Sequence, residues 1–98
     1  MTPREIIKNT LCRHIMAMEC EPTQYDLYES IQYDMNRIND QYNELFRRYK
    51  TLGGKLMETA NPYPIIKKMS AIEAQLDEKS REYRNHYEAL TLVERGVR

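Results

Sequence analysis

The sequence predicts an all-α protein in which a short N-terminal helix is followed by a long antiparallel helical hairpin, assembling into an oligomer. Two observations predict the helices: a capping pattern stands at Thr2 and again at Thr23, and apolar residues recur every three or four positions after each. A third predicts the hairpin, because two of the three glycines, with Pro62 and Pro64, separate the two longest periodic segments. A chain of 98 residues makes one small domain at most.

The first helix is predicted from about Pro3 to Glu19, within an N-terminal segment and linker spanning residues 1–22. Thr2 can cap it, proline suits the first helical position, and Glu5 completes the capping box. Pro22 ends it, because proline fits poorly inside a helix. Its expected apolar stripe is Ile7, Leu11, Ile15 and Met18.

The second helix carries the strongest signal, and residues 23–90 are interpreted as the hairpin that forms the oligomerisation core. Thr23 and Asp26 form a second capping box. An apolar stripe then keeps alternating spacings of three and four, which predicts a helix of about 28 residues and about 42 Å. Gly53 is expected as its left-handed C-terminal cap, reinforced by Gly54. The stripe consists of Tyr28, Ile31, Met35, Ile38, Tyr42, Leu45, Tyr49 and Leu52.

The third helix is predicted to start after "NPYP", with Asn61 as its cap and both prolines in its first turn. Its stripe weakens at Lys79, and a flexible C-terminal tail is expected over residues 91–98. The chain between the helices is expected to reverse around Lys55 to Glu58, so that the two long helices lie antiparallel. The apolar positions are Ile65, Met69, Ile72, Leu76, Tyr83 and Leu90.

Aromatic residues outside the stripes predict self-association. At ~100° per residue, Tyr25 and Tyr33 point away from the stripe of the second helix and Phe46 lies on its flank, while Tyr87 flanks the stripe of the third helix. A two-helix hairpin leaves these four side chains without cover. They are therefore the expected oligomer interface, and head-to-tail contacts that close would make a ring.

Charge is segregated along the chain although its total is zero, with 15 basic and 15 acidic residues. Seven acidic residues oppose only Arg37 between Glu19 and Leu45, whereas six basic residues oppose only Glu58 between Phe46 and Lys68. Folding the hairpin gathers the six at one tip, where they are expected to bind DNA phosphates or an acidic protein surface. The six are Arg47, Arg48, Lys50, Lys55, Lys67 and Lys68.

No pattern in the sequence indicates an enzyme, a cofactor or a metal site. Cys12, His14 and Cys20 lack the paired short spacings of a zinc site, and neither His14 nor His86 has an obvious partner. Carboxylates such as Asp77 occupy positions typical of a solvated helix face. The absence of a long apolar run, of a signal-peptide core and of a disulfide framework favours a cytoplasmic protein that does not cross a membrane.

From residue 23 onward the chain resembles the small subunit of phage terminases, the DNA-packaging machinery. The resemblance lies in "LYESIQYDMNRINDQYNELFRRYKTLG", then "ANPYPIIKKMSAIEAQLDEKSREY", then "ALTLVERGVR". Asn61-Pro62 matches an Asn-Pro that opens the next helix in that family, Leu90-Thr91 matches a Leu-Thr pair, and Arg95 matches a terminal arginine. Ala89 departs from the glycine that the family has there.

This resemblance implies a non-enzymatic ring in the cytoplasm of a bacterial host, which binds double-stranded viral DNA and regulates the large terminase subunit. Two alternatives remain open on the residues alone. One is a helical adaptor that binds another protein through its aromatic face, and the other is a small dimeric phage transcriptional regulator with a basic tip. At the tip itself, docking of the large subunit is the alternative to DNA.

Overall fold

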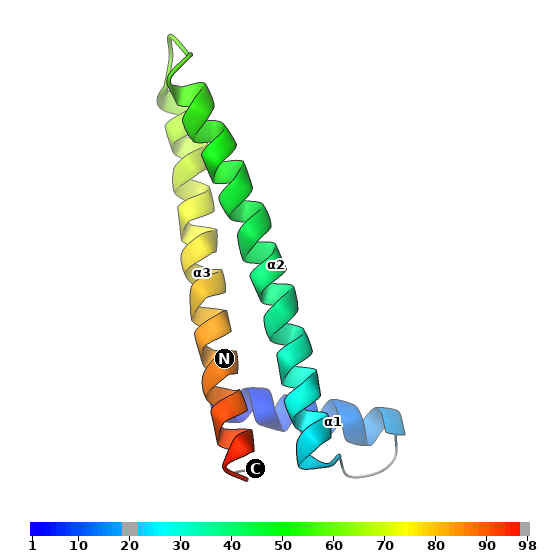
Figure 1. The fold of residues 1–98 in the computed structure, drawn as a ribbon. Coiled ribbons are helices and arrows are strands. Elements are labelled where there is room, and N and C mark those ends of the chain that lie inside the picture. The colour runs from blue at the N-terminus through cyan, green and yellow to red at the C-terminus, as the bar shows by residue number, and fades with distance from the viewer. Residues whose placement is uncertain (19–21, 97–98) are drawn as a thin grey trace.

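A computed structural model of the chain describes residues 1–18 and 22–96, and this part contains three helices and no strand. They are α1 (Pro3–Met18), α2 (Gln24–Leu56) and α3 (Tyr63–Glu94). The predicted all-α class is thereby confirmed. Figure 1 shows α2 and α3 side by side and running in opposite directions, with α1 crossing them at one end. We call that end the base, and the end where residues 57–62 join α2 to α3 the tip; the molecule measures 60 × 22 × 15 Å.

Helix α2 begins at the predicted capping box. The Thr23 hydroxyl accepts a hydrogen bond from the Asp26 N–H (3.1 Å), and the Thr23 N–H donates to the Asp26 carboxylate (3.0 Å). The hydrogen bond from the Thr23 N–H to the carboxylate is the largest cause that lowers the pKa of Asp26, and the Thr23 hydroxyl lowers it further. At the start of α1 the Glu5 N–H likewise donates to the Thr2 hydroxyl (3.2 Å).

The hydrophobic core lies at the base, where all three helices meet. Side chains of α1 pack there against the apolar faces of α2 and α3. Gln24 at the start of α2 also donates hydrogen bonds to the carbonyls of Val93 and Glu94 at the end of α3. The buried members of the core are Ile6, Ile7, Leu27, Ile31, Met35, Ala89, Leu90 and Val93.

The predicted stripe of α2 is the face that it turns toward its neighbours. Ile31, Met35 and Ile38 are buried, and the other five members are half-buried. The stripe predicted for α1 is correct at Ile7 but wrong at Ile15, which is exposed. Figure 1 shows that the C-terminal end of α1 extends beyond α2. Met18 and Glu19 lie outside the part whose side chains are described.

Both predicted C-terminal boundaries are wrong. Helix α2 continues through Gly53 and Gly54 to Leu56, and Met57 caps it in the right-handed conformation. Leu56 is half-buried and follows Leu52 by four positions, so packing carries the helix past the glycines. Helix α3 continues to Glu94 instead of fraying at Thr91, because Val93 is buried in the base core.

The connection at the tip is shorter than predicted and uses a different cap. Pro62 takes the N-cap position of α3, where Asn61 was expected, and Pro64 lies in the first turn. The Asn61 side chain still accepts a hydrogen bond from the Tyr63 N–H (3.4 Å). Asn61 therefore supports the start of α3 from one position further out.

Candidate functional site

The six basic residues predicted to form one cluster all lie at or near the tip, and all six are exposed. Four come from the C-terminal part of α2 and two from the first turns of α3. The antiparallel arrangement of α2 and α3 brings these two groups, far apart in sequence, to the same end of the molecule (Figure 1). Their side chains nevertheless point in different directions, which divides the cluster.

Three of the six line one open groove between α2 and α3, of about 520 Å³. Arg47 and Arg48 stand on its α2 side and Lys68 on its α3 side. Thr51, Leu52, Ala71 and Ile72 complete the lining, so the groove has an apolar floor between cationic rims. We call it the basic groove. Its two sides come from segments about 20 residues apart in the chain.

The other basic residues lie elsewhere around the tip. The Lys50 ammonium sits 4.9 Å from the centroid of the Phe46 ring, which stacks on Tyr42 at 6.3 Å. Lys67 is turned about 100° from Lys68 by the helical rotation of one residue, so the two point to different faces. Lys55 follows Arg48 by seven positions, which returns it to nearly the same side of α2.

Two carboxylates near the groove offset part of its positive charge. Glu44 pairs with Arg47 and also with the Arg48 guanidinium (3.4 Å), at spacings of three and four that helical geometry makes neighbours. The spacing of Glu44 from the two arginines is a signal in the sequence that could have indicated this partner. Across the helices, Tyr49 donates its phenol hydrogen to Glu73 (2.7 Å), which raises the pKa of Tyr49.

The remaining charge still makes the tip positive. Residues 45–72 carry six basic side chains and one acidic, whereas the other described residues carry eight basic and twelve acidic. Within the described ranges, no carboxylate forms an ion pair with Lys55, Lys67 or Lys68. The tip is therefore positive, and the acidic excess lies in the middle of the two long helices, where residues 38–44 and 73–83 carry six acidic and two basic side chains.

The four aromatic residues predicted as an oligomer interface are all exposed, but they do not form one patch. Tyr25, Tyr33, Phe46 and Tyr87 are 67%, 69%, 40% and 58% exposed. At 1.5 Å per residue, Tyr25 and Phe46 lie about 31 Å apart along α2. Tyr25 donates its phenol hydrogen to Glu29 (3.0 Å), and this bond raises the pKa of Tyr25.

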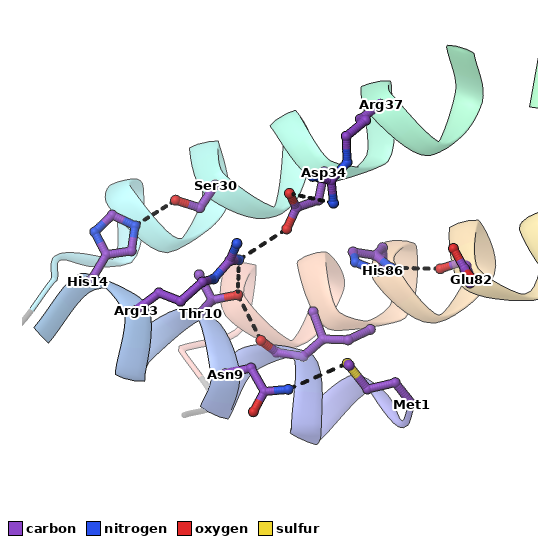
Figure 2. A network of polar contacts seen from close by, with 11 residues as sticks. Met1, Asn9, Thr10, Arg13, His14, Ser30, Asp34, Arg37, Glu82 and His86 are labelled. Carbon is purple, nitrogen blue, oxygen red and sulfur yellow. Dashed lines mark hydrogen bonds and ion pairs between the residues drawn. The ribbon is translucent and has the colours of Figure 1, made fainter. Parts of the chain in front are cut away.

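A separate polar network joins α1 to α2 at the base, as Figure 2 shows. Arg13 pairs with the buried carboxylate of Asp34 (3.1 Å), which also pairs with Arg37 (3.5 Å). A hydrogen bond of 2.6 Å joins His14 to Ser30, and another of 2.7 Å joins His86 to the Glu82 carbonyl. Both histidines thus have partners, contrary to expectation, and these contacts fix helices to one another or close a helical turn.

Cys12 is exposed, and Cys20 lies outside the described residues. No group of three or more His, Cys, Asp and Glu side chains that could hold a metal ion occurs in residues 1–18 and 22–96. In the same part of the chain, no helix is both long and apolar enough to cross a membrane.

Comparison with known proteins gave no match: no family model, no curated protein and no solved structure is similar to this chain at a significant level. The basic groove, the exposed aromatic residues and the positive tip are therefore the features that bear on function. Of these, only the basic groove brings cationic side chains from two helices together around a concave surface, so it is the candidate site.

Proposed function

We propose that this chain is a non-catalytic DNA-binding subunit that assembles with copies of itself and holds DNA phosphates in the basic groove. The observation that carries the proposal is the convergence of Arg47, Arg48 and Lys68 on one groove from two helices. Within the resemblance to terminase small subunits, the assembly would be a ring in the cytoplasm of a bacterial host. There it would bind double-stranded viral DNA and regulate the large terminase subunit.

Phosphate is a suitable ligand for these side chains. Guanidinium groups match phosphate oxygens with paired hydrogen bonds, and an exposed lysine adds a mobile positive charge. Glu44 offsets part of the arginine charge, but Lys55, Lys67 and Lys68 add positive charge around the groove. Contacts of this kind read the DNA backbone and not the bases, so binding should tolerate changes of sequence and weaken with salt.

Self-assembly would strengthen such weak contacts. The four exposed aromatic side chains supply apolar area that the monomer leaves in water. A ring would repeat the basic groove in every subunit, and several weak contacts with one DNA molecule give useful avidity.

The floor of the groove favours a second candidate function. Leu52, Ala71 and Ile72 offer apolar surface that a phosphate backbone does not use. An acidic protein segment with an apolar side chain would use both the floor and the cationic rims. Docking of a partner protein, such as the large terminase subunit, is therefore the alternative to DNA binding at this site. A helical adaptor would use the groove in the same way.

Binding to a fluorescent DNA duplex of arbitrary sequence, measured by anisotropy at low salt, tests the proposal. The double variant Lys67→Glu/Lys68→Glu should bind at least tenfold more weakly than the parent while keeping its mass in light scattering. The matched control is Arg81→Glu/Arg84→Glu, which makes the same charge change on exposed residues of α3 farther from the tip. Equal binding by the parent and the tip variant would show that the tip is not the DNA site, and the docking alternative would take its place.

A further inference from the structure

One exposed ridge of α2 carries aromatic and acidic side chains, which the lining of the basic groove does not contain. Tyr25, Glu29 and Tyr33 are spaced by four residues each, so they lie in a row on the face of α2 that points away from its apolar stripe. Both tyrosines are about two-thirds exposed and Glu29 is exposed as well. Asp26, beside the row, adds a second carboxylate. We call this row the acidic ridge.

The ridge and the groove are complementary in chemistry. The groove offers an apolar floor between Arg47, Arg48 and Lys68, and the ridge offers aromatic rings beside a carboxylate. The hydrogen bond from Tyr25 to Glu29 holds the ring and the carboxylate together in one arrangement before any contact is made. Tyrosine and arginine are also the residue types that contribute most at protein interfaces.

The two features also agree in size. Positions 47–52 of α2 and 68–72 of α3 line the groove, which gives it a length of about 8 Å. Tyr25 and Glu29 are about 6 Å apart along the helix, so this pair fits within that length. Tyr33 stands another turn along the ridge and would lie at the rim.

A molecule cannot place its own ridge in its own groove. The ridge lies near the base and the groove near the tip of a rod 60 Å long, and both belong to the same rigid helix pair. The ridge that occupies the groove therefore belongs to a second copy of the chain. Two positive tips repel each other, whereas the carboxylate of Glu29 on the ridge attracts the cationic rims of another copy's groove.

We propose that the acidic ridge of one copy docks in the basic groove of another, with Tyr25 on the apolar floor and Glu29 between Arg48 and Lys68. The contact is head-to-tail and leaves a free groove at one end and a free ridge at the other. It deepens the proposed function, since the ridge would occupy the groove assigned to DNA. DNA and the ridge of a second copy then exclude each other, and the DNA-free protein masks its own binding site.

Charge reversal on each side of the contact tests the proposal without DNA. Sedimentation velocity at low salt should show self-association of the parent that weakens as salt is added. Glu29→Lys and Lys68→Glu should each reduce this association. An equimolar mixture of the two variants should restore it, because each then meets a partner of opposite charge. Circular dichroism of each variant checks that the helices are retained.

A matched control is Glu78→Lys, which makes the same charge change at an exposed position of α3 and should associate like the parent. The proposal is overturned if the parent stays monomeric at low salt, if Glu29→Lys associates like the parent, or if the mixture associates no better than either variant alone. Since no DNA is present, none of these results depends on the DNA-binding proposal.

A second arm adds the DNA duplex. Glu29→Lys should bind duplex more tightly than Glu78→Lys, although both carry the same net charge, because only the first frees the groove. Equal affinity of these two variants contradicts the masking of the groove. If neither the parent nor either variant binds the duplex, and the association results are as expected, the DNA-binding proposal is overturned and the head-to-tail contact stands.

Discussion

Arg13 of α1 lies 3.1 Å from the carboxylate of Asp34 of α2, whose residue is only 6% exposed (Figure 2). The two residues are 21 positions apart and tie α1 to the base. Arg37 holds the second carboxylate oxygen at 3.5 Å. Both arginine side chains are more than half exposed, so either can return to water if the carboxylate is removed.

From this geometry, Asp34→Ala should lower the free energy of unfolding by about 1–2 kcal/mol, which is less than for a fully buried ion pair. Arg13→Ala should cost less, because Arg37 still neutralises the carboxylate. Urea unfolding followed by circular dichroism measures both. A larger loss for Arg13→Ala than for Asp34→Ala would contradict this interpretation of the network.

The capping box of α2 predicts a stability change that depends on pH. Thr23→Ala should lower the free energy of unfolding by about 1 kcal/mol at neutral pH. The control Thr51→Ala lies within α2 and is exposed, so it should cost little or nothing.

The sign of the pH effect follows from Asp26. The pKa of Asp26 is lower in the folded chain than its ordinary value of 3.8, so its contribution is present above that value. It is lost as the pH falls through the folded pKa. Thr23→Ala removes only the hydroxyl, the smaller cause, and keeps the backbone N–H. In thermal unfolding, the parent should therefore lose slightly more stability than Thr23→Ala on acidification below 3.8. The same loss in both would show that the Thr23 hydroxyl does not contribute to the lowered pKa.

Two glycines should respond to alanine in opposite directions. Gly54 lies inside α2, and the methyl group of an alanine there would extend into open space, so Gly54→Ala should stabilise the protein by about 0.5–1 kcal/mol. Gly96 has a φ of 78°, and Gly96→Ala should cost about 1 kcal/mol. Thermal denaturation compares them. A destabilised Gly54→Ala would mean that α2 ends at the glycines after all.

Local patterns in the sequence predicted most of the helical structure. The stripe from Ile31 to Leu52 and the capping box at Thr23 are each set by residues a few positions apart, and both are present. The predicted ends of α2 and α3 were wrong because Leu56 is half-buried and Val93 is buried in the base core, and this burial outweighs the local signal for a stop.

The candidate site was predicted only in outline. Its six residues could be named from composition, but their division between faces depends on how α3 is rotated against α2. Lys67 and Lys68 are neighbours in sequence, yet only Lys68 lines the groove. Contacts such as Arg13 with Asp34 join distant positions and leave no spacing pattern to detect. The pairing of Glu44 with Arg47 and Arg48 is local and could have been predicted.

The salt dependence of duplex binding by the parent and by Lys68→Ala tests most directly whether the basic groove holds DNA phosphates. The logarithm of the parent's binding constant should fall linearly with the logarithm of salt concentration between roughly 50 and 200 mM. Removing one phosphate contact should make that slope shallower by about 0.9 in Lys68→Ala. The control Lys8→Ala, an exposed lysine of α1 at the base, should keep the parent's slope. No duplex binding by the parent at low salt, or the same slope in the parent and Lys68→Ala, would contradict DNA binding in the basic groove.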